Sequence, residues 1–565
     1  MSGSRLNLIT IFVLVAGVVL GVRLFHKQVI ECQQYRAKAA RQHITRQEIQ
    51  AQRGSLYINE QYGEPYPIAT NITYYQVLVV PRSLKDARKT ARALSPIIGI
   101  SEQELFSKIN NKKLYIPPLK KHMVKSEADK VDKLVMAGVY ITPELVRYYP
   151  ESSMAGHLLG YVDTEGIGNY GLEAYYNEAL EGSMGIRVSS RDSRGRKIAT
   201  IKNEVNKEDG ADIILETEHN VQFKAEEVIA NAVKDHGADR GSMIVMDTRT
   251  GGILAMANVP SYDPNNYSKV AKDSLEIFRN PAISEAWEPG SIMKPLVMGA
   301  ALDQGLVTPD TTGDYDSCVT VQGYKICTAT KKAFGHETMT QVLENSDNVA
   351  MVSVGDKLGN EMLFRYLKAL GFGEKERVDL QGEAMGMLSD FKKWRDLTRS
   401  TIVFGQGMTV TPLQMVNAYA AVANKGVLVK PHVVKEIKNS DGSVTSIKRE
   451  DIRRVFKGET AAELTQMLIS VVEKGHGKRA GVKGYWVAGK TGTAQIPNPD
   501  GGYYEDRQVG SFAGFFPADN PRFAMIVKID NPKNTQWAES SAAPTFGQMA
   551  QWLLSYYRIA PNRNN

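Results

Sequence analysis

The sequence is poor in the residues that build disulfide frameworks and metal sites. Its 565 residues include three cysteines and nine histidines, and no group of them has the spacing of a zinc site. An excess of one charge is also lacking, because 69 Lys and Arg stand against 62 Asp and Glu. The resulting net charge of +7 is too dilute over this length for a nucleic-acid-binding surface. We therefore expect no bound metal and no nucleic acid partner.

One long apolar run lies at the N-terminus. Residues 6–25 are apolar except for Asn7, Thr10 and Arg23. A helix of about 20 residues is roughly 30 Å long, which is enough to cross the hydrocarbon core of a membrane. We predict that residues 1–25 form a short cytoplasmic tip and a transmembrane helix.

A cleaved signal peptide is the alternative interpretation of this run. Its small-residue cleavage site should follow the apolar residues directly, whereas the available candidate, at residues 37–39, lies well beyond them. An uncleaved anchor is therefore favoured, with a polar juxtamembrane linker over residues 26–48. Basic residues flank the run on both sides, so the charge pattern leaves the orientation open.

The rest of the chain has globular composition, with 42% hydrophobic and 23% charged residues, and its length suits about two to four domains. In residues 49–214 strand-like runs alternate with charged helical stretches, which predicts an α+β pedestal module. A composition shift begins a second domain over residues 215–560. Its patterns predict a helix at 221–232, a hairpin at 241–256 and a helix-rich middle at 292–468. Three strands, at 485–493, 511–516 and 523–529, and a closing helix from near Pro544 follow.

This order of elements predicts a multidomain α+β fold. The strands of the second domain form an antiparallel five-stranded sheet between its terminal helices on one side and a helical subdomain, inserted in the middle of the sequence, on the other. A cleft between the sheet and the helical subdomain is the expected place for chemistry.

The first candidate for chemistry is Ser291 with Lys294. Pro295 is tolerated only in a first helical turn, so Ser291 lies at a helix start. At positions i and i+3 the hydroxyl and the amine share a face. A lysine desolvated in a cleft could lose its proton and act as base for the serine. Taken alone, the pattern is more typical of a surface helix.

The second candidate is the polar segment Ser346-Asp347-Asn348 between two apolar helical stretches, which predicts a loop. A serine there could relay a proton, and the Asn348 amide could hold a substrate amide. Taken alone, the segment is more typical of a helix cap between core helices.

The third candidate lies in residues 484–491, which match the phosphate-loop pattern G-x-x-x-x-G-K-[ST]. A phosphate loop follows a strand and opens a helix, but here the residues between the glycines are strand-like and no helix follows. As the edge of a strand, the segment presents Lys490 on one face and Thr491 and Thr493 on the other, and Gly492 lets a substrate backbone approach. Such an edge could bind an extended peptide by strand addition.

Together the three candidates form the ordered set S-x-x-K, S-D-N and K-T-G, which is typical of serine acyl-transfer enzymes of the penicillin-binding class. The chain resembles a class B penicillin-binding protein of the division type over nearly its whole length. Further similar blocks lie at 53–57, 147–150, 156–162, 171–173, 288–291, 405–407, 411–414 and 488–495. Residues 59–63 depart from the family pattern. This departure concerns a hairpin of the pedestal and not the catalysis.

The resemblance implies a D,D-transpeptidase that needs no cofactor and acts on peptidoglycan stem peptides. Ser291 would be the nucleophile and Lys294 its base, while Ser346, with Lys490 nearby, would pass the proton to the leaving amine. Asn348 would hold the substrate amide. The backbone N–H groups of Ser291 and Thr493 would form the oxyanion hole, and Thr491 and Thr493, with Gly492 between them, would bind the terminal carboxylate.

The resemblance also implies a setting for this reaction. The catalytic domain would lie outside the cytoplasm, on a single-pass anchor in the cytoplasmic membrane. A SEDS-family glycosyltransferase would polymerise the glycan, other division proteins would be partners, and β-lactams would inhibit. Residues 529–533 look more like the division branch than the elongation branch. The alternatives are an elongation enzyme, a β-lactamase or β-lactam sensor, and a catalytically degenerate scaffold protein.

Cys318 and Cys327 are placed to pair. If Gln322 and Gly323 form a two-residue hairpin turn, the two cysteines lie directly opposite each other within disulfide reach. Outside the cytoplasm such a pair can oxidise. Two reduced thiols on a surface ribbon are the alternative.

Overall fold

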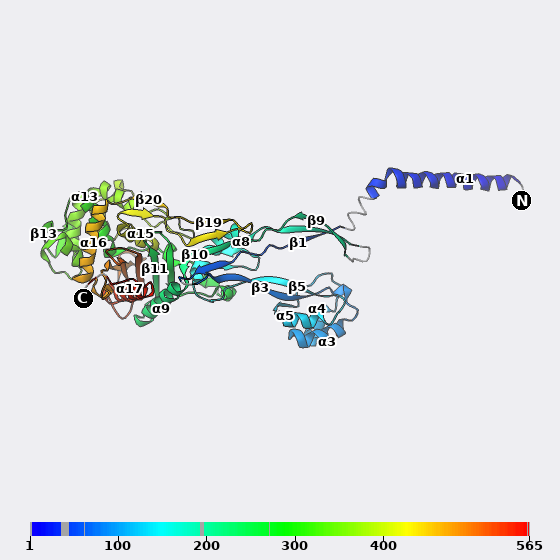
Figure 1. Cartoon of the computed structure of the whole chain (residues 1–565), viewed down its shortest axis with the longest axis horizontal. Helices are drawn as coiled ribbons and strands as arrows, with labels where there is room; N and C mark the ends of the chain where they lie inside the picture. The colour runs from blue at the N-terminus through cyan, green and yellow to red at the C-terminus, as the bar shows by residue number, and fades with distance from the viewer. Residues whose placement is uncertain are drawn as a thin grey trace. The chain divides into compact units, whose positions relative to one another are not determined.

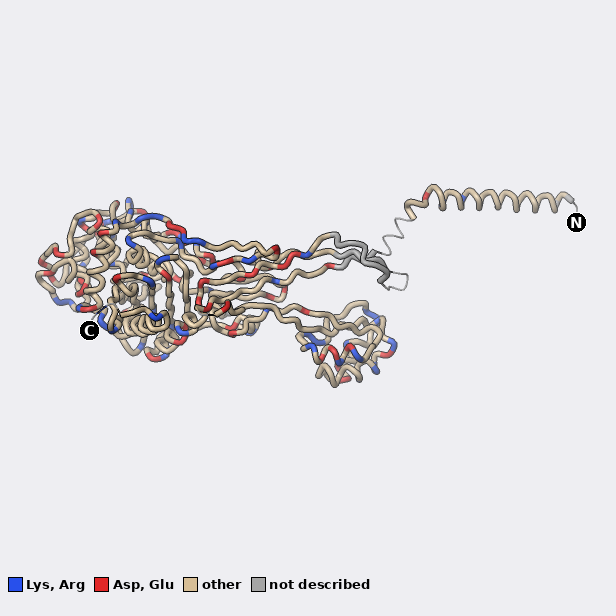
Figure 2. Tube along the Cα trace, in the orientation of Figure 1, with Lys and Arg blue, Asp and Glu red and all other residues tan. Residues whose placement is uncertain are grey.

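The computed structural model describes residues 3–35, 44–61, 63–191, 197–270, 272–561 and 563. The chain forms two compact units, one of residues 1–53 with 181–210 and one of residues 54–180 with 211–565. In the second unit Lys and Arg are interspersed with Asp and Glu (Figure 2).

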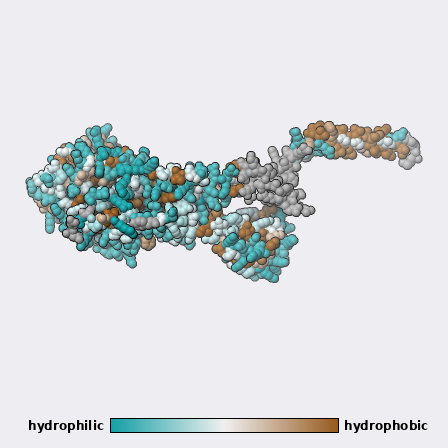
Figure 3. Space-filling model, in the orientation of Figure 1, coloured by the Kyte–Doolittle hydropathy of each residue, from teal (hydrophilic) through white to brown (hydrophobic). Residues whose placement is uncertain are grey.

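The first unit begins with a single apolar helix, α1 (Gly3–Phe25), which continues as the π-helical turn η1 (His26–Ile30). Within Leu6–Ile30 the most apolar 18-residue stretch has a mean hydropathy of 2.6, and none of this stretch is buried. By length and composition this helix can cross a membrane, and Figure 3 shows the hydrophobic side chains along it. The apolar run is therefore helical: α1 ends at Phe25, and η1 continues to Ile30.

The remainder of the first unit is a three-stranded antiparallel sheet in the order β1-β8-β9. Its strands are β1 (Ile44–Ile49), β8 (Gly185–Arg191) and β9 (Lys197–Val205). The predicted linker over 26–48 thus includes η1 and most of β1, while residues 36–43 lie outside the described part of the chain.

The second unit contains a seven-stranded sheet in the order β19-β18-β10-β2-β3-β4, with β5 also paired to β3. The strands are β2 (Leu56–Asn59), β3 (Tyr66–Val79), β4 (Lys120–Met123), β5 (Val139–Tyr148), β10 (Asp212–Glu218), β18 (Val434–Lys438) and β19 (Val444–Ser446). Two of them come from more than 200 residues downstream of β10, a pairing that the sequence pattern did not indicate.

Three helices cover one end of this sheet, namely α3 (Ala87–Ile98), α4 (Glu102–Ile109) and α5 (Lys125–Asp132). Two of them begin at side-chain caps, since Asp86 accepts from the Lys89 N–H and Ser101 from the Glu104 N–H. Such caps satisfy backbone donors that the first helical turn leaves free. Their apolar faces share a separate core with the sheet, to which Val77 contributes.

The five-stranded sheet of the second domain has the order β12-β11-β23-β22-β21, and every neighbouring pair is antiparallel. The strands are β11 (Arg240–Asp247), β12 (Ile253–Val259), β21 (Ala488–Pro497), β22 (Tyr503–Phe516) and β23 (Phe523–Asp530). One face packs against α9 (His219–Asp235) and α17 (Ala542–Tyr556). The predicted sheet and its two terminal helices are confirmed.

The other face of the sheet packs against the helices of the middle region, and Figure 1 shows β11 between α15 and α9. These helices are α11 (Lys294–Asp303), α12 (Met339–Glu344), α13 (Asn348–Ala369), α14 (Asp396–Ile402), α15 (Pro412–Ala423) and α16 (Gly458–Glu473). Three two-stranded ribbons accompany them: β13 (Thr312–Tyr315) with β16 (Gly335–Thr338), β14 (Cys318–Val321) with β15 (Tyr324–Cys327), and β17 (Val427–Val429) with β20 (Asp451–Arg454).

Short elements complete the second unit. They are α6 (Gly156–Leu159), β6 (Tyr161–Val162), β7 (Gly168–Asn169), α7 (Gly171–Tyr175), α8 (Asn177–Glu181) and α10 (Pro281–Ser284).

The β14–β15 hairpin has the predicted register. Cys318 pairs with Cys327, and Gln322 and Gly323 have φ values of 48° and 84°. Positive φ at both central positions matches the twist of the flanking strands. The two cysteines form a disulfide with their Cα atoms 4.0 Å apart, and Cys32 is a free thiol.

We predict that protein isolated from its membrane without reductant carries this disulfide. Alkylation under denaturing, non-reducing conditions should then modify Cys32 alone, and alkylation after reduction should modify all three cysteines. Intact-mass analysis of the two samples measures the difference. Alkylation at three sites without reductant would show that the pair is reduced in the native compartment.

Candidate active site

Ser291 is positioned by two glycines that touch. It lies in the 3₁₀ turn η5 (Gly290–Met293), which leads directly into α11. The Gly290 N–H donates to the Gly405 carbonyl at 3.1 Å. Gly405 has φ 81°, and a Cβ placed on it would come within 2.2 Å of the Gly290 oxygen. Only glycine fits such an approach in this conformation, so the predicted block at 405–407 has a positioning role.

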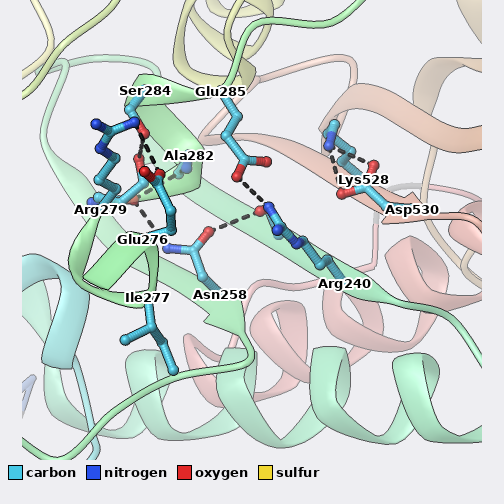
Figure 4. Close-up of polar contacts among 12 residues, drawn as sticks. Arg240, Asn258, Glu276, Ile277, Arg279, Ala282, Ser284, Glu285, Lys528 and Asp530 are labelled. Atoms are coloured by element: carbon cyan, nitrogen blue, oxygen red, sulfur yellow. Dashed lines mark hydrogen bonds and ion pairs between the residues drawn. The ribbon is translucent and has the colours of Figure 1, made fainter. Parts of the chain in front are cut away.

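The segment before Ser291 is fixed to one end of the five-stranded sheet. Figure 4 shows the ion pair between Arg240, at the start of β11, and Glu285, and a second pair between Lys528 and Asp530 of β23. The Lys528 amine lies 5.5 Å from the centre of the Trp287 ring. The Arg240–Glu285 and Lys528–Trp287 contacts join the segment before Ser291 to the sheet.

Lys294 is the most constrained side chain of the site. It is fully buried, and its Nζ donates to the Ser346 carbonyl at 2.6 Å, to Ser346 Oγ at 3.1 Å and to Asn348 Oδ1 at 2.7 Å. Two of the three sequence motifs are therefore in direct contact. Among the described residues no hydrogen bond joins Ser291 Oγ to Lys294 or to Ser346.

The Asn348 side chain is oriented from both ends. Its Oδ1 accepts from Lys294, while its Nδ2 donates to the Cys327 carbonyl at 2.9 Å. The disulfide hairpin thus fixes which way the amide points, because the carbonyl of Cys327 can only accept. The sequence predicted the hairpin and its cysteine pair, but no pattern indicated that the hairpin also orients Asn348.

The loop between α12 and α13 holds Ser346 in an uncommon conformation. Thr338 and Gln341 form a capping box at the start of α12, and Asp347 caps α13 by accepting from the N–H groups of Val349 and Ala350. Between the two helices Ser346 has φ 54°. A non-glycine residue in this region costs about 1–3 kcal/mol, and the caps on either side hold it there.

Lys490 lies on β21, the outermost strand of the sheet. Its fully buried amine donates to the Thr491 carbonyl at 3.2 Å and to Thr491 Oγ1 at 3.3 Å. A Cβ on Gly492 would come within 2.9 Å of the Pro289 oxygen. The predicted strand edge therefore lies beside the turn that carries Ser291. The strand begins at Ala488 and not at Tyr485, and the phosphate-loop interpretation is wrong because Gly489, Lys490 and Thr491 lie within β21 and the strand β22, not a helix, follows them.

Thr493 receives a contact that the sequence did not indicate. Its Oγ1 accepts from the Ala538 N–H at 3.2 Å, which ties β21 to the segment before α17. The hydroxyl proton of Thr493 stays available to donate, since a hydroxyl has one donor and two acceptor positions.

Burial disfavours the charged form of both lysines. Desolvation lowers the pKa of Lys294 well below its usual 10.5, the charge of Lys490 lowers it further, and Asp347 partly opposes them. Burial also lowers the pKa of Lys490, to about 7, against an opposing effect of Glu539. A neutral Lys294 amine is the form that can accept a proton from a hydroxyl.

The family of the chain follows from comparison with known proteins. Residues 241–551 match the family "Penicillin binding protein transpeptidase domain", and residues 48–215 match "Penicillin-binding Protein dimerisation domain". The chain therefore belongs to the class B penicillin-binding proteins, and it is a peptidoglycan D,D-transpeptidase of that family.

Individual relatives support this assignment. The chain is 34% identical to "Stage V sporulation protein D" of Bacillus subtilis over 88% of this chain and 78% of that protein. It is 30% identical to "Peptidoglycan D,D-transpeptidase FtsI" of Escherichia coli over 91% and 85% of the two chains. The solved structure of Mycobacterium tuberculosis penicillin-binding protein 3 with aztreonam has a TM-score of 0.72 and 27% identity, covering 92% of this chain and 98% of that one.

We predict that Gly405→Ala disturbs the site more than a matched glycine change elsewhere. Gly382→Ala is the control, because Gly382 also has positive φ, at 93°, but a Cβ placed on it would meet no atom within 4 Å. Both changes bear the conformational cost of about 1–2 kcal/mol, and only Gly405→Ala adds the overlap with Gly290. Thermal unfolding and the rate of labelling by a fluorescent penicillin measure the effect. Equal losses in the two variants would contradict the positioning role.

Proposed function

We propose that Ser291 is the acylated residue and Lys294 its general base. The observation that carries this proposal is the buried Lys294 amine, which lies one helical turn after Ser291 and contacts both Ser346 and Asn348. In the reaction Ser291 Oγ attacks the penultimate D-Ala carbonyl of a stem peptide, and its proton passes to Lys294. The tetrahedral oxyanion is held by the backbone N–H groups of Ser291 and Thr493.

The remaining residues serve the leaving group and the substrate. Ser346 passes a proton to the amine of the departing D-Ala, with Lys490 nearby, and Asn348 holds the substrate amide. Thr491 and Thr493 bind the terminal carboxylate, on either side of Gly492, where the absence of a side chain lets the peptide backbone approach the strand. An amine of a second stem peptide then attacks the ester and frees Ser291.

A hydrolase with the same nucleophile is the competing function. Hydrolysis of the ester needs a carboxylate that positions water, as a glutamate between the second and third motifs does in class A β-lactamases. Four glutamates between these motifs have other partners: Glu361 bonds to Arg365, Glu374 to Lys368, Glu376 to Asn417 and Glu383 to the Glu376 N–H. This favours a transpeptidase that keeps its ester for an amine.

We predict a stable penicilloyl adduct on Ser291. Excess penicillin should add one ligand mass to the full chain, and the adduct should persist for many minutes. Ser291→Ala should add no mass, and Lys294→Ala should react about 10² to 10⁴ times more slowly, because the general base is lost. Intact-mass analysis over time measures all three proteins.

Two results would count against this prediction. Labelling of a folded Ser291→Ala protein would exclude Ser291 as the nucleophile. Rapid return of the wild-type protein to its free mass with repeated turnover would make the chain a hydrolase. Circular dichroism of each variant shows whether the fold is retained.

We infer further that the chain works in septal cell-wall synthesis, with its catalytic domain outside the cytoplasm and residues 1–25 in the membrane. Residues 26–48 would then link this anchor to a pedestal of residues 49–214 and a transpeptidase domain of residues 215–560. A SEDS-family glycosyltransferase would supply the glycan strands, and other division proteins would be partners. Peptidoglycan stem peptides lie outside the cytoplasmic membrane, and residues 529–533 resemble the division branch.

The septal role predicts the shape of depleted cells. Loss of a septal transpeptidase blocks division but not growth, so depletion in the host should give filaments, scored by light microscopy. Swollen spheres would instead assign the chain to elongation.

A further inference from the structure

Two carboxyl groups are buried behind the loop that carries Ser346 and Asn348. Glu337, on β16, is 2% exposed, and Asp347, in the loop itself, is 0% exposed. Their side chains lie close together, and burial and the charge of Asp347 both help to raise the pKa of Glu337. In the described part of the chain Glu337 Oε2 and Asp347 Oδ2 have no hydrogen-bond partner.

The second oxygen of each carboxyl group is satisfied. Glu337 Oε1 accepts from Asn345 Nδ2 at 2.6 Å. Asp347 Oδ1 accepts from the N–H groups of Val349 and Ala350, at 2.6 and 3.1 Å. Two ionised carboxylates cannot hydrogen-bond to each other, and their repulsion is strong in a buried place. One proton on the pair would satisfy both unpartnered oxygens with a single hydrogen bond and remove the repulsion.

The surroundings decide which residue carries this proton. Asp347 Oδ1 accepts two backbone N–H groups at the N-terminus of α13, the end of a helix that suits a carboxylate. Glu337 has a single amide donor and the unfavourable charge of Glu344, which is itself bonded to Ser470 of α16. On β13, the strand paired with β16, the exposed Asp314 bonds to His336, the residue before Glu337. Glu337 is accordingly the protonated partner.

We propose that Glu337 is a positioning residue of the transpeptidase, which donates a hydrogen bond from its protonated carboxyl group to Asp347 and thereby holds the loop of Ser346 and Asn348 against Lys294. This proposal rests on the proposed function of the loop.

The effect reaches the site through a short chain of contacts. Asn345, Glu337 and Asp347 fix the loop on either side of Ser346, whose φ of 54° needs support from its neighbours. Asn348 follows Asp347 directly and accepts from Lys294. If Glu337 loses its proton, the two carboxylates repel each other and the loop moves away from Lys294. Burial and the neighbouring Asp347 raise the pKa of Glu337 to about 7, so this loss falls in an accessible pH range.

The test compares the wild-type protein with Glu337→Gln and Glu337→Leu. Glutamine keeps both hydrogen bonds, because its amide nitrogen can donate to Asp347 and its oxygen can accept from Asn345, but it cannot ionise. Leucine removes both hydrogen bonds. The second-order rate constant of acylation by a fluorescent penicillin is measured for the full chain from about pH 6 to about pH 9, on either side of the raised carboxyl pKa.

At the low end of this range wild-type protein and Glu337→Gln should react at similar rates. At the high end the wild-type protein should be at least about 5-fold slower than Glu337→Gln, because its loop is displaced. Lys294 and Lys490 titrate in both proteins, so their effects cancel in the ratio. Glu337→Leu should be about 10-fold or more slower at every pH. Asp314→Asn, a change at an exposed residue of the adjacent strand, should keep the wild-type profile.

A ratio of wild type to Glu337→Gln that stays constant with pH would overturn the proposal. So would a Glu337→Leu protein that is folded and reacts at the wild-type rate. If Glu337→Leu does not fold, the pH dependence of the Glu337→Gln ratio decides. Failure of the proposed function is seen separately, because it would show as labelling of Ser291→Ala.

Discussion

The buried amine of Lys294 is the contact on which the rest of the site depends. Its three acceptors come from Ser346 and Asn348, more than 50 residues downstream. An amine without water needs such partners, since an unsatisfied buried polar group costs about 1–3 kcal/mol. These hydrogen bonds therefore hold the first two motifs together. Burial of the same amine lowers its pKa and so favours the neutral form, which can accept a proton.

The five-stranded sheet forms one side of the site. Its edge strand carries Lys490, and its opposite face is covered by α9 and α17, so the strand cannot shift without disturbing a second core. The turn with Ser291 touches this edge through Gly290 and Gly492, where the absence of side chains permits backbone contact. Ser291 thus lies between the edge strand of the sheet and the helical subdomain.

Much of this fold was predictable because its signals are local. The hairpin at 241–256, the closing helix from Pro544 and the two-residue turn at Gln322 and Gly323 are each encoded by neighbouring residues. The addition of β18 and β19 to the sheet of the pedestal was not predictable. These short strands have the pattern of surface segments, and their partner β10 lies about 220 residues earlier in the sequence.

The sequence by itself determined the three motifs, their order and the type of element that carries each one, because turn chemistry and side-chain periodicity act over a few residues. Only the tertiary structure decided that Cys327 orients Asn348, that Ala538 binds Thr493 and that Glu337 faces Asp347. The two residues in each of these contacts are too far apart in the sequence for helix or strand periodicity to relate them. They arise when helices and strands pack, and packing depends on the shape of the whole domain.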